Sequence, residues 1–270
     1  MNKQLNVCIG GATGWTGLPL CREILKAKDL NLIGAVSRKH AGENLGKILE
    51  EPDLNLVIQK SVNEALTVPA DVYVDFTHAN VVKDHVLIAV HKKVHVVVGS
   101  SGLTDRDYQE IHQAALQNGV GVVACGNFAT SAILLQRFAC EAAQFLSHWE
   151  VIDYASAAKP DAPSGMARQL AFRLSEIRKP EVEHPISKTV GPVESRGATL
   201  NDTQIHSIRL PGFVIGLEVL FGETDERLSI RYDAGASPAP YLAGALIAIR
   251  NVGGSAGLIR GIDSFLFQQK

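Results

Sequence analysis

The sequence has little of what marks several large classes of protein. Only four of its 270 residues are cysteine, and Cys8, Cys21, Cys125 and Cys140 show no C-x-x-C spacing, so we expect reduced thiols that pack as small hydrophobes. No apolar run approaches the ~20 residues of a membrane helix. The amino terminus also lacks the basic and then apolar segments of a signal peptide. These absences predict a cytoplasmic protein without a membrane partner.

An excess of charge of one sign is lacking as well. The chain carries 26 basic and 28 acidic residues, a formal net charge of −2, with no long block of either sign. A nucleic-acid surface or an anionic-membrane surface is therefore not indicated. The apolar content of 46% is enough for a full core, and there is no repeat or low-complexity tract. We expect the partners to be small molecules or further copies of the chain.

The first apolar run leads into a glycine-rich turn. Residues 5–9 read as a strand, Gly-Gly-Ala-Thr-Gly-Trp-Thr-Gly occupies residues 10–17, and a segment with helical spacing follows. Strand, turn and helix stand in the order of a dinucleotide site. In such a site Gly11 makes the tight turn, Gly14 admits the pyrophosphate and Gly17 lets the helix pack closely. A glycine turn without a nucleotide is the alternative interpretation.

A basic turn follows the second predicted strand, residues 30–36. It lies about 20 residues after the glycine motif, where an NAD enzyme places an acid for the ribose 2′-hydroxyl. Ser37, Arg38 and Lys39 stand there instead. Two cations and no carboxylate would accept a 2′-phosphate, which favours NADPH over NADH as cofactor, although NADH stays possible. A solvated basic turn is the alternative.

Strands and helices alternate through the next part of the chain. After an irregular region that ends near Pro69, residues 71–76, 95–98 and 120–124 read as buried strands, and residues 80–91 as a helix. This order predicts a parallel, doubly wound sheet. Ligands of such sheets bind beyond the carboxyl ends of the strands, so the turns there should converge on the cofactor. The expected cofactor-binding residues are Gly11, Ala12, Thr13, Gly14, Trp15, Thr16, Gly17, Ser37, Arg38, Phe76, Thr77, Gly99, Ser100, Ser101, Cys125, Gly126, Asn127 and Phe128.

Four histidines fall in the same part of the chain, at positions 78, 85, 91 and 95. We interpret them as helix-surface and strand-end residues rather than metal ligands, and we expect no bound metal.

The pattern changes after a helical segment at residues 132–146. In order, we expect a strand at 149–158, a helix at 166–178, a loop over 183–203, three antiparallel strands at 204–210, 214–221 and 227–232, and a helix at 241–249. The chain could then return to the first domain. The predicted fold class is α/β, a Rossmann-type doubly wound parallel sheet plus a second α+β domain with a mixed or antiparallel sheet. The first domain would comprise residues 1–128 and about 239–270, and the second residues 129–238.

The loop Lys159-Pro-Asp-Ala-Pro-Ser-Gly165 joins the strand and helix of the second domain. Ser164 is a candidate N-cap, and the backbone N–H groups after it would form an anion site at the start of the helix. Together with Lys159, this loop is suited to a carboxylate or a phosphate. An ordinary capped helix after a proline turn is the alternative.

Taken together, these motifs resemble the 4-hydroxy-tetrahydrodipicolinate reductase family of the lysine pathway, also called dihydrodipicolinate reductase. The resemblance covers nearly the whole chain, and its most specific string is Lys159-x-Asp-Ala-Pro-Ser-Gly165. It implies that the first domain binds a reduced nicotinamide cofactor. It also implies that the second domain binds a cyclic dicarboxylate imine and builds a homotetramer through its sheet. By the same resemblance Lys159 takes part in catalysis and binding, and the Ser164-Gly165 segment holds a substrate carboxylate.

The chain departs from the family at several positions of the expected substrate site. A pair of histidines, the first proposed as proton donor and the second as a substrate contact, is replaced by Ala155 and Ser156. The threonine after Ser-Gly is replaced by Met166, and two further histidines by Glu218 and Tyr232. This set of losses favours a site adapted to another ligand or another proton donor.

We therefore expect hydride transfer from NADPH to a C=N bond or a conjugated C=C bond of a small, cyclic substrate that carries carboxylates. The expected catalytic residue is Lys159. The proton donor stays open between Lys159, Tyr154, Tyr232, Glu218 and a water held by Ser156. Two alternatives stay open: an authentic lysine-pathway reductase with a relocated general acid, and a catalytically silent NADPH-binding protein. The expected substrate-binding residues are Ser156, Lys159, Ser164, Gly165, Met166, Glu218 and Tyr232.

Overall fold

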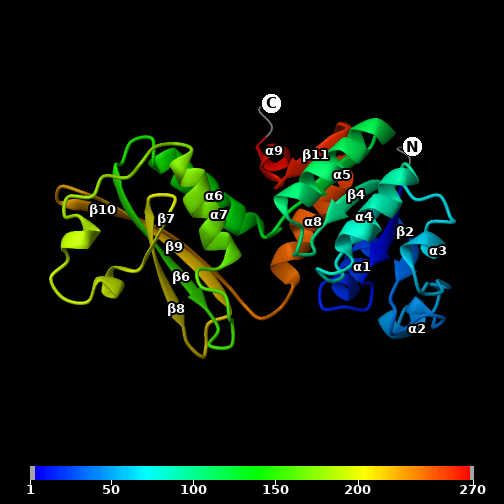
Figure 1. Ribbon diagram of the computed structural model, residues 1–270. Coiled ribbons are helices and arrows are strands. Elements are labelled where there is room, and N and C mark those ends of the chain that lie inside the picture. Colours follow the sequence, from blue (N-terminus) through cyan, green and yellow to red (C-terminus); the bar gives the residue numbers. More distant parts are fainter. Residues whose placement is uncertain (1–3, 268–270) are drawn as a thin grey trace. The chain divides into compact units, whose positions relative to one another are not determined.

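The computed structural model describes residues 4–267 and divides into two compact units (Figure 1). One unit comprises the residues up to Ala129 together with those from Pro238 onward, and the other comprises Thr130–Ser237. The second unit is therefore inserted into the first along the chain. None of the helices in the described part is both long and apolar enough to cross a membrane.

The first unit is built on a six-stranded sheet with the order β11-β5-β4-β3-β1-β2. Every strand pair in it is parallel, which confirms the predicted Rossmann-type sheet. The strands are β1 (Leu5–Gly10), β2 (Leu30–Val36), β3 (Val72–Asp75), β4 (His95–Val98), β5 (Gly121–Ala124) and β11 (Gly257–Arg260). The helices are α1 (Gly17–Lys26), α2 (Leu45–Leu49), α3 (Val62–Ala65), α4 (Val82–His91), α5 (Asp105–Asn118), α8 (Ala239–Asn251) and α9 (Asp263–Leu266), with a 3₁₀ turn η3 (Val252–Gly254).

Both faces of this sheet are buried, which explains its short, continuous apolar strands. In β4 the side chains of Val96 and Val98 join one core cluster with Val86 of α4 and Ile111 of α5. Val97 is also fully buried, and because successive residues of a strand point to opposite faces it packs on the other side. Helix α1 packs beside α8, and α4 packs beside α5. The helices thus cover the sheet, while the carboxyl ends of its strands remain available for a ligand.

The structure contains helices that the hydrophobic pattern does not predict. The region up to Pro69, expected to be irregular, holds α2 and α3, which are too short to show a period. Helix α5 is long, but only Ile111 and Ala115 are fully buried along it. Its ends are set locally instead, by a capping box between Thr104 and Asp107 and by a left-handed Gly119. A mostly solvated helix of this kind leaves little trace in the apolar pattern.

The second unit has a five-stranded mixed sheet with the order β10-β9-β6-β8-β7. Helix α6 (Thr130–Ala142) packs against β9 and β10, and α7 (Gly165–Ser175) against β6, β7 and β8. The strands are β6 (His148–Ala155), β7 (Ala198–Leu200), β8 (Thr203–Arg209), β9 (Ile215–Glu223) and β10 (Glu226–Ala234).

Two expectations for this unit are wrong in detail. The last three strands do not form an antiparallel series, because β6 lies between β8 and β9 and pairs in parallel with β8. Strand β6 also ends at Ala155 rather than at residue 158, because a turn closes there, with the Lys159 N–H donating to the Ser156 carbonyl at 3.0 Å.

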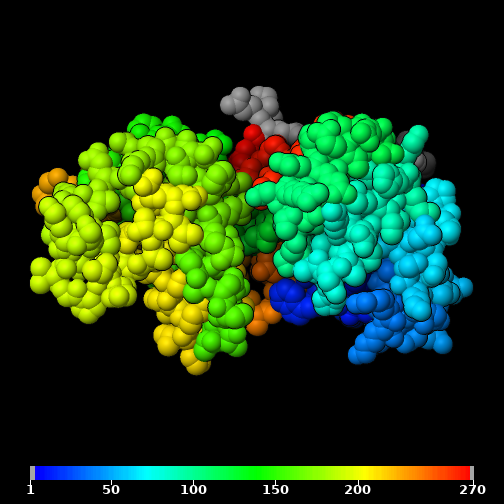
Figure 2. Space-filling view, in the orientation of Figure 1, coloured from blue at the N-terminus to red at the C-terminus, as the bar shows by residue number. Residues whose placement is uncertain are grey.

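The segment over 183–203, expected to be a loop, contains β7 and two 3₁₀ turns, η1 (Ile186–Lys188) and η2 (Val193–Arg196). Its residues are mostly exposed, and they form the yellow-green surface at the left of Figure 2. The two 3₁₀ turns are too short for a periodic apolar pattern to reveal them.

Candidate functional site

The glycine-rich turn after β1 depends on glycine at two positions. Gly11 has φ of 77°, and a Cβ added to it would lie 2.3 Å from the Phe76 carbonyl oxygen. A Cβ on Gly17 would lie 2.1 Å from the Gly11 carbonyl oxygen. Both distances are far below van der Waals contact, so no larger side chain fits without moving the backbone. The turn thereby starts α1 directly at the end of β1, as a dinucleotide site requires.

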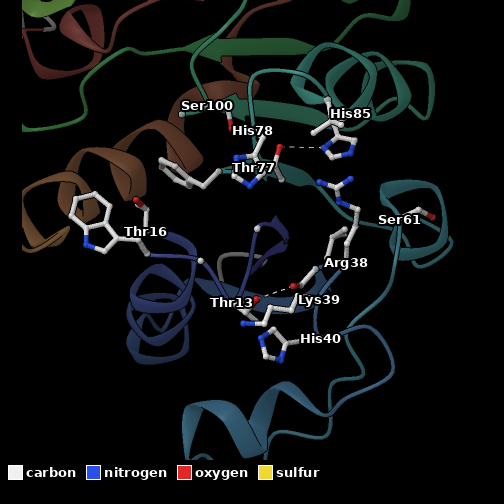
Figure 3. Close-up of a pocket in the computed structure, with 18 of the residues that line it drawn as sticks. Thr13, Thr16, Arg38, Lys39, His40, Ser61, Thr77, His78, His85 and Ser100 are labelled. Carbon is white, nitrogen blue, oxygen red and sulfur yellow. Dashed lines mark hydrogen bonds between the residues drawn. The ribbon is translucent and has the colours of Figure 1, made fainter. Parts of the chain in front are cut away.

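A cavity of about 810 Å³ opens beside this turn. It lies at the carboxyl ends of β1 to β4 (Figure 3), where parallel sheets bind ligands. Among the predicted cofactor residues, its lining includes Gly11, Thr13, Gly14, Trp15, Thr16, Ser37, Arg38, Phe76, Thr77, Gly99, Ser100 and Ser101. Residues outside that prediction also line it: Val36, Lys39, His40, Lys60, Ser61, His78, Val81 and His85.

The remaining predicted cofactor residues do not line the cavity. Ala12 and Gly17 are buried behind the glycine turn. The other four, Cys125, Gly126, Asn127 and Phe128, follow β5, one strand beyond the cavity. The ring of Phe128 packs edge-on against that of Phe76, with the centroids 5.8 Å apart. The turn after β5 therefore supports the cavity wall through Phe76.

The end of the cavity beyond β2 is basic. Arg38, Lys39 and Lys60 line it, and the described lining residues include no aspartate or glutamate. The Arg38 side chain extends toward the side of the cavity that carries Thr77 and His85 (Figure 3). Lys60 reaches the site because residue 59 forms a bridge with Val36. No local sequence signal could have revealed that long-range pairing.

A buried carboxylate organises the opposite wall. Asp75, fully buried at the end of β3, accepts hydrogen bonds from the Thr77 hydroxyl at 2.7 Å and the Ser100 hydroxyl at 2.6 Å. The Tyr73 hydroxyl donates to it at 2.8 Å, and His85 Nδ1 lies 3.0 Å from it. Burial alone would raise the pKa of Asp75, but these hydrogen bonds outweigh it and lower the pKa. The ionised carboxylate thus fixes three groups of the cavity wall.

Two of the four histidines also have a place in the cavity. His78 and His85 line the cavity, and His85 is held by Asp75. As the sequence predicts, His85 lies on α4 and His78 follows the end of β3, and β3 and α4 meet through the polar contact of Asp75 with His85. Among the described residues no group of three or more His, Cys, Asp or Glu side chains is arranged to hold a metal ion.

In the second unit, the predicted N-cap at the start of α7 is confirmed. The Ser164 side chain accepts a hydrogen bond from the Ala167 N–H at 3.3 Å. Gly165, the first residue of α7, is exposed. In the same loop Lys159 Nζ lies 2.7 Å from Asp161 Oδ1, and this hydrogen bond lowers the pKa of Asp161. The Lys159 ammonium group is therefore paired with a carboxylate of its own loop.

The positions at which the chain departs from the family are not all brought together. Ala155 is buried at the end of β6, Ser156 follows it, and Met166 is buried in the first turn of α7. Directly opposite residues of neighbouring strands share a face. Tyr232 stands opposite Leu217 and Glu218 opposite Arg231. Glu218 and Tyr232 therefore lie on opposite faces of the sheet.

Tyr154 shares the face of Glu218, and its hydroxyl donates to Glu218 Oε2 at 2.8 Å. Arg231 lies over the Tyr154 ring, with 4.6 Å between the guanidinium carbon and the ring centroid. Burial, and then the hydrogen bond to Glu218 and its negative charge, raise the pKa of Tyr154. This tyrosine keeps its proton in a packed polar cluster on the sheet.

Comparison with known proteins identifies the chain's relatives. The family model described as dihydrodipicolinate reductase, N-terminus, matches residues 5–128, and its C-terminus counterpart matches residues 131–266. The 4-hydroxy-tetrahydrodipicolinate reductase of Desulfitobacterium hafniense (strain DSM 10664 / DCB-2) is 37% identical over 269 residues, covering 98% of this chain and 99% of the relative. That of Moorella thermoacetica is 33% identical over 268 residues, with the same coverage.

Solved structures agree with this assignment. The dipicolinate-bound dihydrodipicolinate reductase from Paenisporosarcina sp. TG-14 matches with a TM-score of 0.83 and 26% identity, over 97% of this chain and 99% of that one. An amine dehydrogenase from Mycobacterium smegmatis shares the fold, with a TM-score of 0.69 and 14% identity, over 96% and 95% of the two chains. The chain belongs to the dihydrodipicolinate reductase family.

Proposed function

We propose that this NAD(P)H-dependent reductase uses NADPH to reduce a C=N bond, or a conjugated C=C bond, in a small cyclic substrate that carries carboxylates. The observation that carries the proposal is the loop of Lys159 and Ser164, which brings a partly exposed ammonium group, paired with Asp161, and a capped helix start into one short segment. The N-cap alone would serve the stability of α7, but a cation beside an N-capped helix start also suits a substrate carboxylate. The catalytically silent alternative is correspondingly disfavoured.

The residues of the first unit fit a nicotinamide cofactor. Gly11 and Gly17 leave no room for side chains at the turn, so backbone N–H groups at the start of α1 can approach a pyrophosphate. When bound, the reduced nicotinamide supplies the hydride. The hydroxyls of Thr77 and Ser100, held by Asp75, are hydrogen-bonding groups that can orient the cofactor in the cavity.

The preference for NADPH rests on the basic end of the cavity. Arg38→Ala should weaken NADPH binding roughly tenfold to a hundredfold, the range for losing one hydrogen bond to a charged group, and should change NADH binding far less. Fluorescence titration with both cofactors measures this difference. Lys92→Ala, an exposed cation outside the cavity, serves as the control. Equal losses for NADPH and NADH would contradict the assignment.

For the proton donor we propose Lys159. Tyr154 is hydrogen-bonded to Glu218 within a packed cluster, and Tyr232 lies on the other face of the sheet. Lys159 is paired with Asp161, but this pair is partly exposed in the loop that we propose to hold the substrate anion. Lys159→Arg keeps the positive charge but cannot release a proton near neutral pH. We expect this variant to retain affinity for dipicolinate while turnover falls about 10²–10⁴-fold. Turnover equal to the wild type's would point to another donor, with Tyr154→Phe and Glu218→Gln as the next variants to assay.

The substrate itself is tested by steady-state assays. Because the paired histidines are replaced by Ala155 and Ser156, we expect 4-hydroxy-tetrahydrodipicolinate to be reduced slowly and another cyclic imine, imino acid or enone to be reduced faster. A rate on the family substrate equal to that of the Desulfitobacterium relative would contradict an adapted site. It would favour an authentic lysine-pathway enzyme with a relocated acid. Complementation of a strain lacking that reductase tests the same alternative in cells.

A further inference from the structure

A buried ion pair underlies the anion-binding loop. Asp153 on β6 is fully buried, and Arg209 on the neighbouring parallel strand β8 places Nη2 2.7 Å from Asp153 Oδ2. The guanidinium is itself mostly covered, with 16% of the Arg209 side chain exposed. Its Nη1 donates to the Asp153 carbonyl at 3.2 Å and to the Ile208 carbonyl at 2.9 Å. The two side chains are thus locked to each other and to the sheet.

This pair holds the loop at both of its functional ends. The Ser164 N–H donates to Asp153 Oδ2 at 2.8 Å, which anchors the residue that caps α7. Arg209 Nη2 donates to the carbonyl of Asp161 at 2.7 Å. The carboxylate of the same Asp161 lies 2.7 Å from Lys159 Nζ. A continuous path of short contacts therefore runs from the buried pair to the ammonium group and to the helix start.

The energetics of the pair argue for a role beyond stability. Replacing a buried ion pair by apolar side chains is often neutral or stabilising, because desolvation offsets the attraction of the charges. Within the described residues, Asp153 Oδ1 and Arg209 Nε are buried and have no hydrogen-bond partner, which adds to the cost. Because the two charges cancel, the pair also adds no net charge beneath the loop.

We infer that Asp153 and Arg209 are positioning residues of the substrate site. They fix the Lys159 ammonium group and the first turn of α7 relative to each other, so that one carboxylate can meet both. The inference rests on the proposed function, in which this loop holds a substrate carboxylate. It assigns a role to two residues that touch neither the cofactor cavity nor the exposed surface of the loop.

The test compares ligand affinities of variants. Arg209→Ala would leave a buried carboxylate unpaired, so the informative variants are Arg209→Lys and the neutral pair Asp153→Asn/Arg209→Gln. We expect the affinity for dipicolinate, measured by isothermal titration, to fall about tenfold or more in both. In Arg209→Lys the reason is that a lysine cannot bond both Asp153 and the Asp161 carbonyl with a planar fork. In the neutral pair, hydrogen bonds between uncharged amides are weaker than those of the ion pair. KM for the substrate that the enzyme reduces should rise by a similar factor, with a smaller change in kcat.

Two readouts separate positioning from general damage. NADPH affinity, a property of the first unit, should stay within about twofold of wild type, because neither Asp153 nor Arg209 is among the residues that line the cavity. Arg227→Gln, an exposed arginine of the same sheet, should leave dipicolinate affinity unchanged. If circular dichroism shows that the variant with the neutral pair does not fold, the dipicolinate affinity of Arg209→Lys alone tests the inference.

Unchanged dipicolinate affinity and unchanged KM in the folded variants would overturn the inference while leaving the proposed function intact. Failure of the proposed function would appear instead in measurements on the wild-type protein. If the wild-type protein binds no dicarboxylate and reduces no carboxylate-bearing substrate, the loop holds no such ligand and the inference fails with it.

Discussion

Asp75 shows how one buried side chain can set the geometry of a binding wall. Its carboxylate receives hydrogen bonds from Tyr73, Thr77 and Ser100 while completely buried. A neutral carboxamide could accept some of these bonds but would turn an NH₂ group toward donors. The free energy of unfolding therefore depends on whether the Asp75 carboxyl is ionised, and this dependence can be measured by varying the pH.

Asp75→Asn should lower the free energy of unfolding by roughly 2–4 kcal/mol near neutral pH, because a buried charged hydrogen-bond network is broken. The folded-state pKa of Asp75 is lowered below the ordinary 3.8. The contribution of the Asp75 charge to the free energy of unfolding is therefore fully present above the ordinary pKa of 3.8, and it is lost as the pH falls through the lower pKa of the folded state. Urea unfolding of variant and wild type at about pH 7 and about pH 3 should show the difference shrinking in acid. A difference that is constant with pH would contradict this account.

The close packing of Gly17 against the glycine-rich turn can also be tested by substitution. A Cβ at this position would lie 2.1 Å from the Gly11 carbonyl oxygen, so Gly17→Ala must push α1 away from the turn. We expect a loss of about 1–3 kcal/mol in stability, as for other overpacked sites, together with weaker NADPH binding. Gly254→Ala is the matched control, because nothing lies within 4 Å of a Cβ there. Wild-type NADPH affinity in Gly17→Ala would show that the turn can adjust.

Sequence alone predicts residues whose role is local. The turn at Gly11, the close packing at Gly17 and the N-cap at Ser164 each follow from neighbours within a few positions. Lys60, by contrast, is brought to the cavity by the bridge between residue 59 and Val36, and His85 is held there by its contact with Asp75. No pattern within their own segments encodes those contacts.

Among the elements, α7 illustrates how a helix start can serve both folding and binding. Ser164 caps it through the bond from the Ala167 N–H. Ser164→Ala should reduce the free energy of unfolding by about 1 kcal/mol, and Ser164→Gly by only a few tenths, the usual order for N-caps. Thermal or urea unfolding measures both. The reverse order, with glycine costing more than alanine, would show that backbone freedom rather than the cap controls the start of α7.

The sequence predicts the bounds of strands that have strong apolar runs. Strands β2 and β4 have the expected bounds of 30–36 and 95–98. Helix α5 is not predicted, because its buried stripe is narrow. The parallel pairing of β6 with β8 is not predicted either. Local periodicity identifies a strand but does not say which strand will be its neighbour, so sheet order in the second unit required the structure.

At the scale of the whole molecule, we propose that the second unit builds a homotetramer through its sheet. Helices α6 and α7 pack on this sheet, and Leu220, Ser229 and Arg231 are exposed on it. Leu220 stands opposite Ser229 on β10, so both lie on one face.

Leu220→Asp should therefore shift the sedimentation velocity profile toward smaller species, because a charge would be buried without a partner. Phe172→Asp, which changes an exposed apolar residue of α7, should leave the profile unchanged. A wild-type protein that sediments as a monomer would contradict the proposed assembly.

The insertion of the second unit between Ala129 and Pro238 has a consequence for synthesis on the ribosome. Strand β11 pairs with β5, yet it is made only after the whole inserted unit. At 5–20 residues per second, the exposed edge of β5 would wait roughly 7 to 27 seconds for its neighbour. The nucleotide-binding unit, although it begins first, is thus the last to be completed. A nascent chain stalled before Gly257 presents to chaperones an open edge that the finished protein does not have.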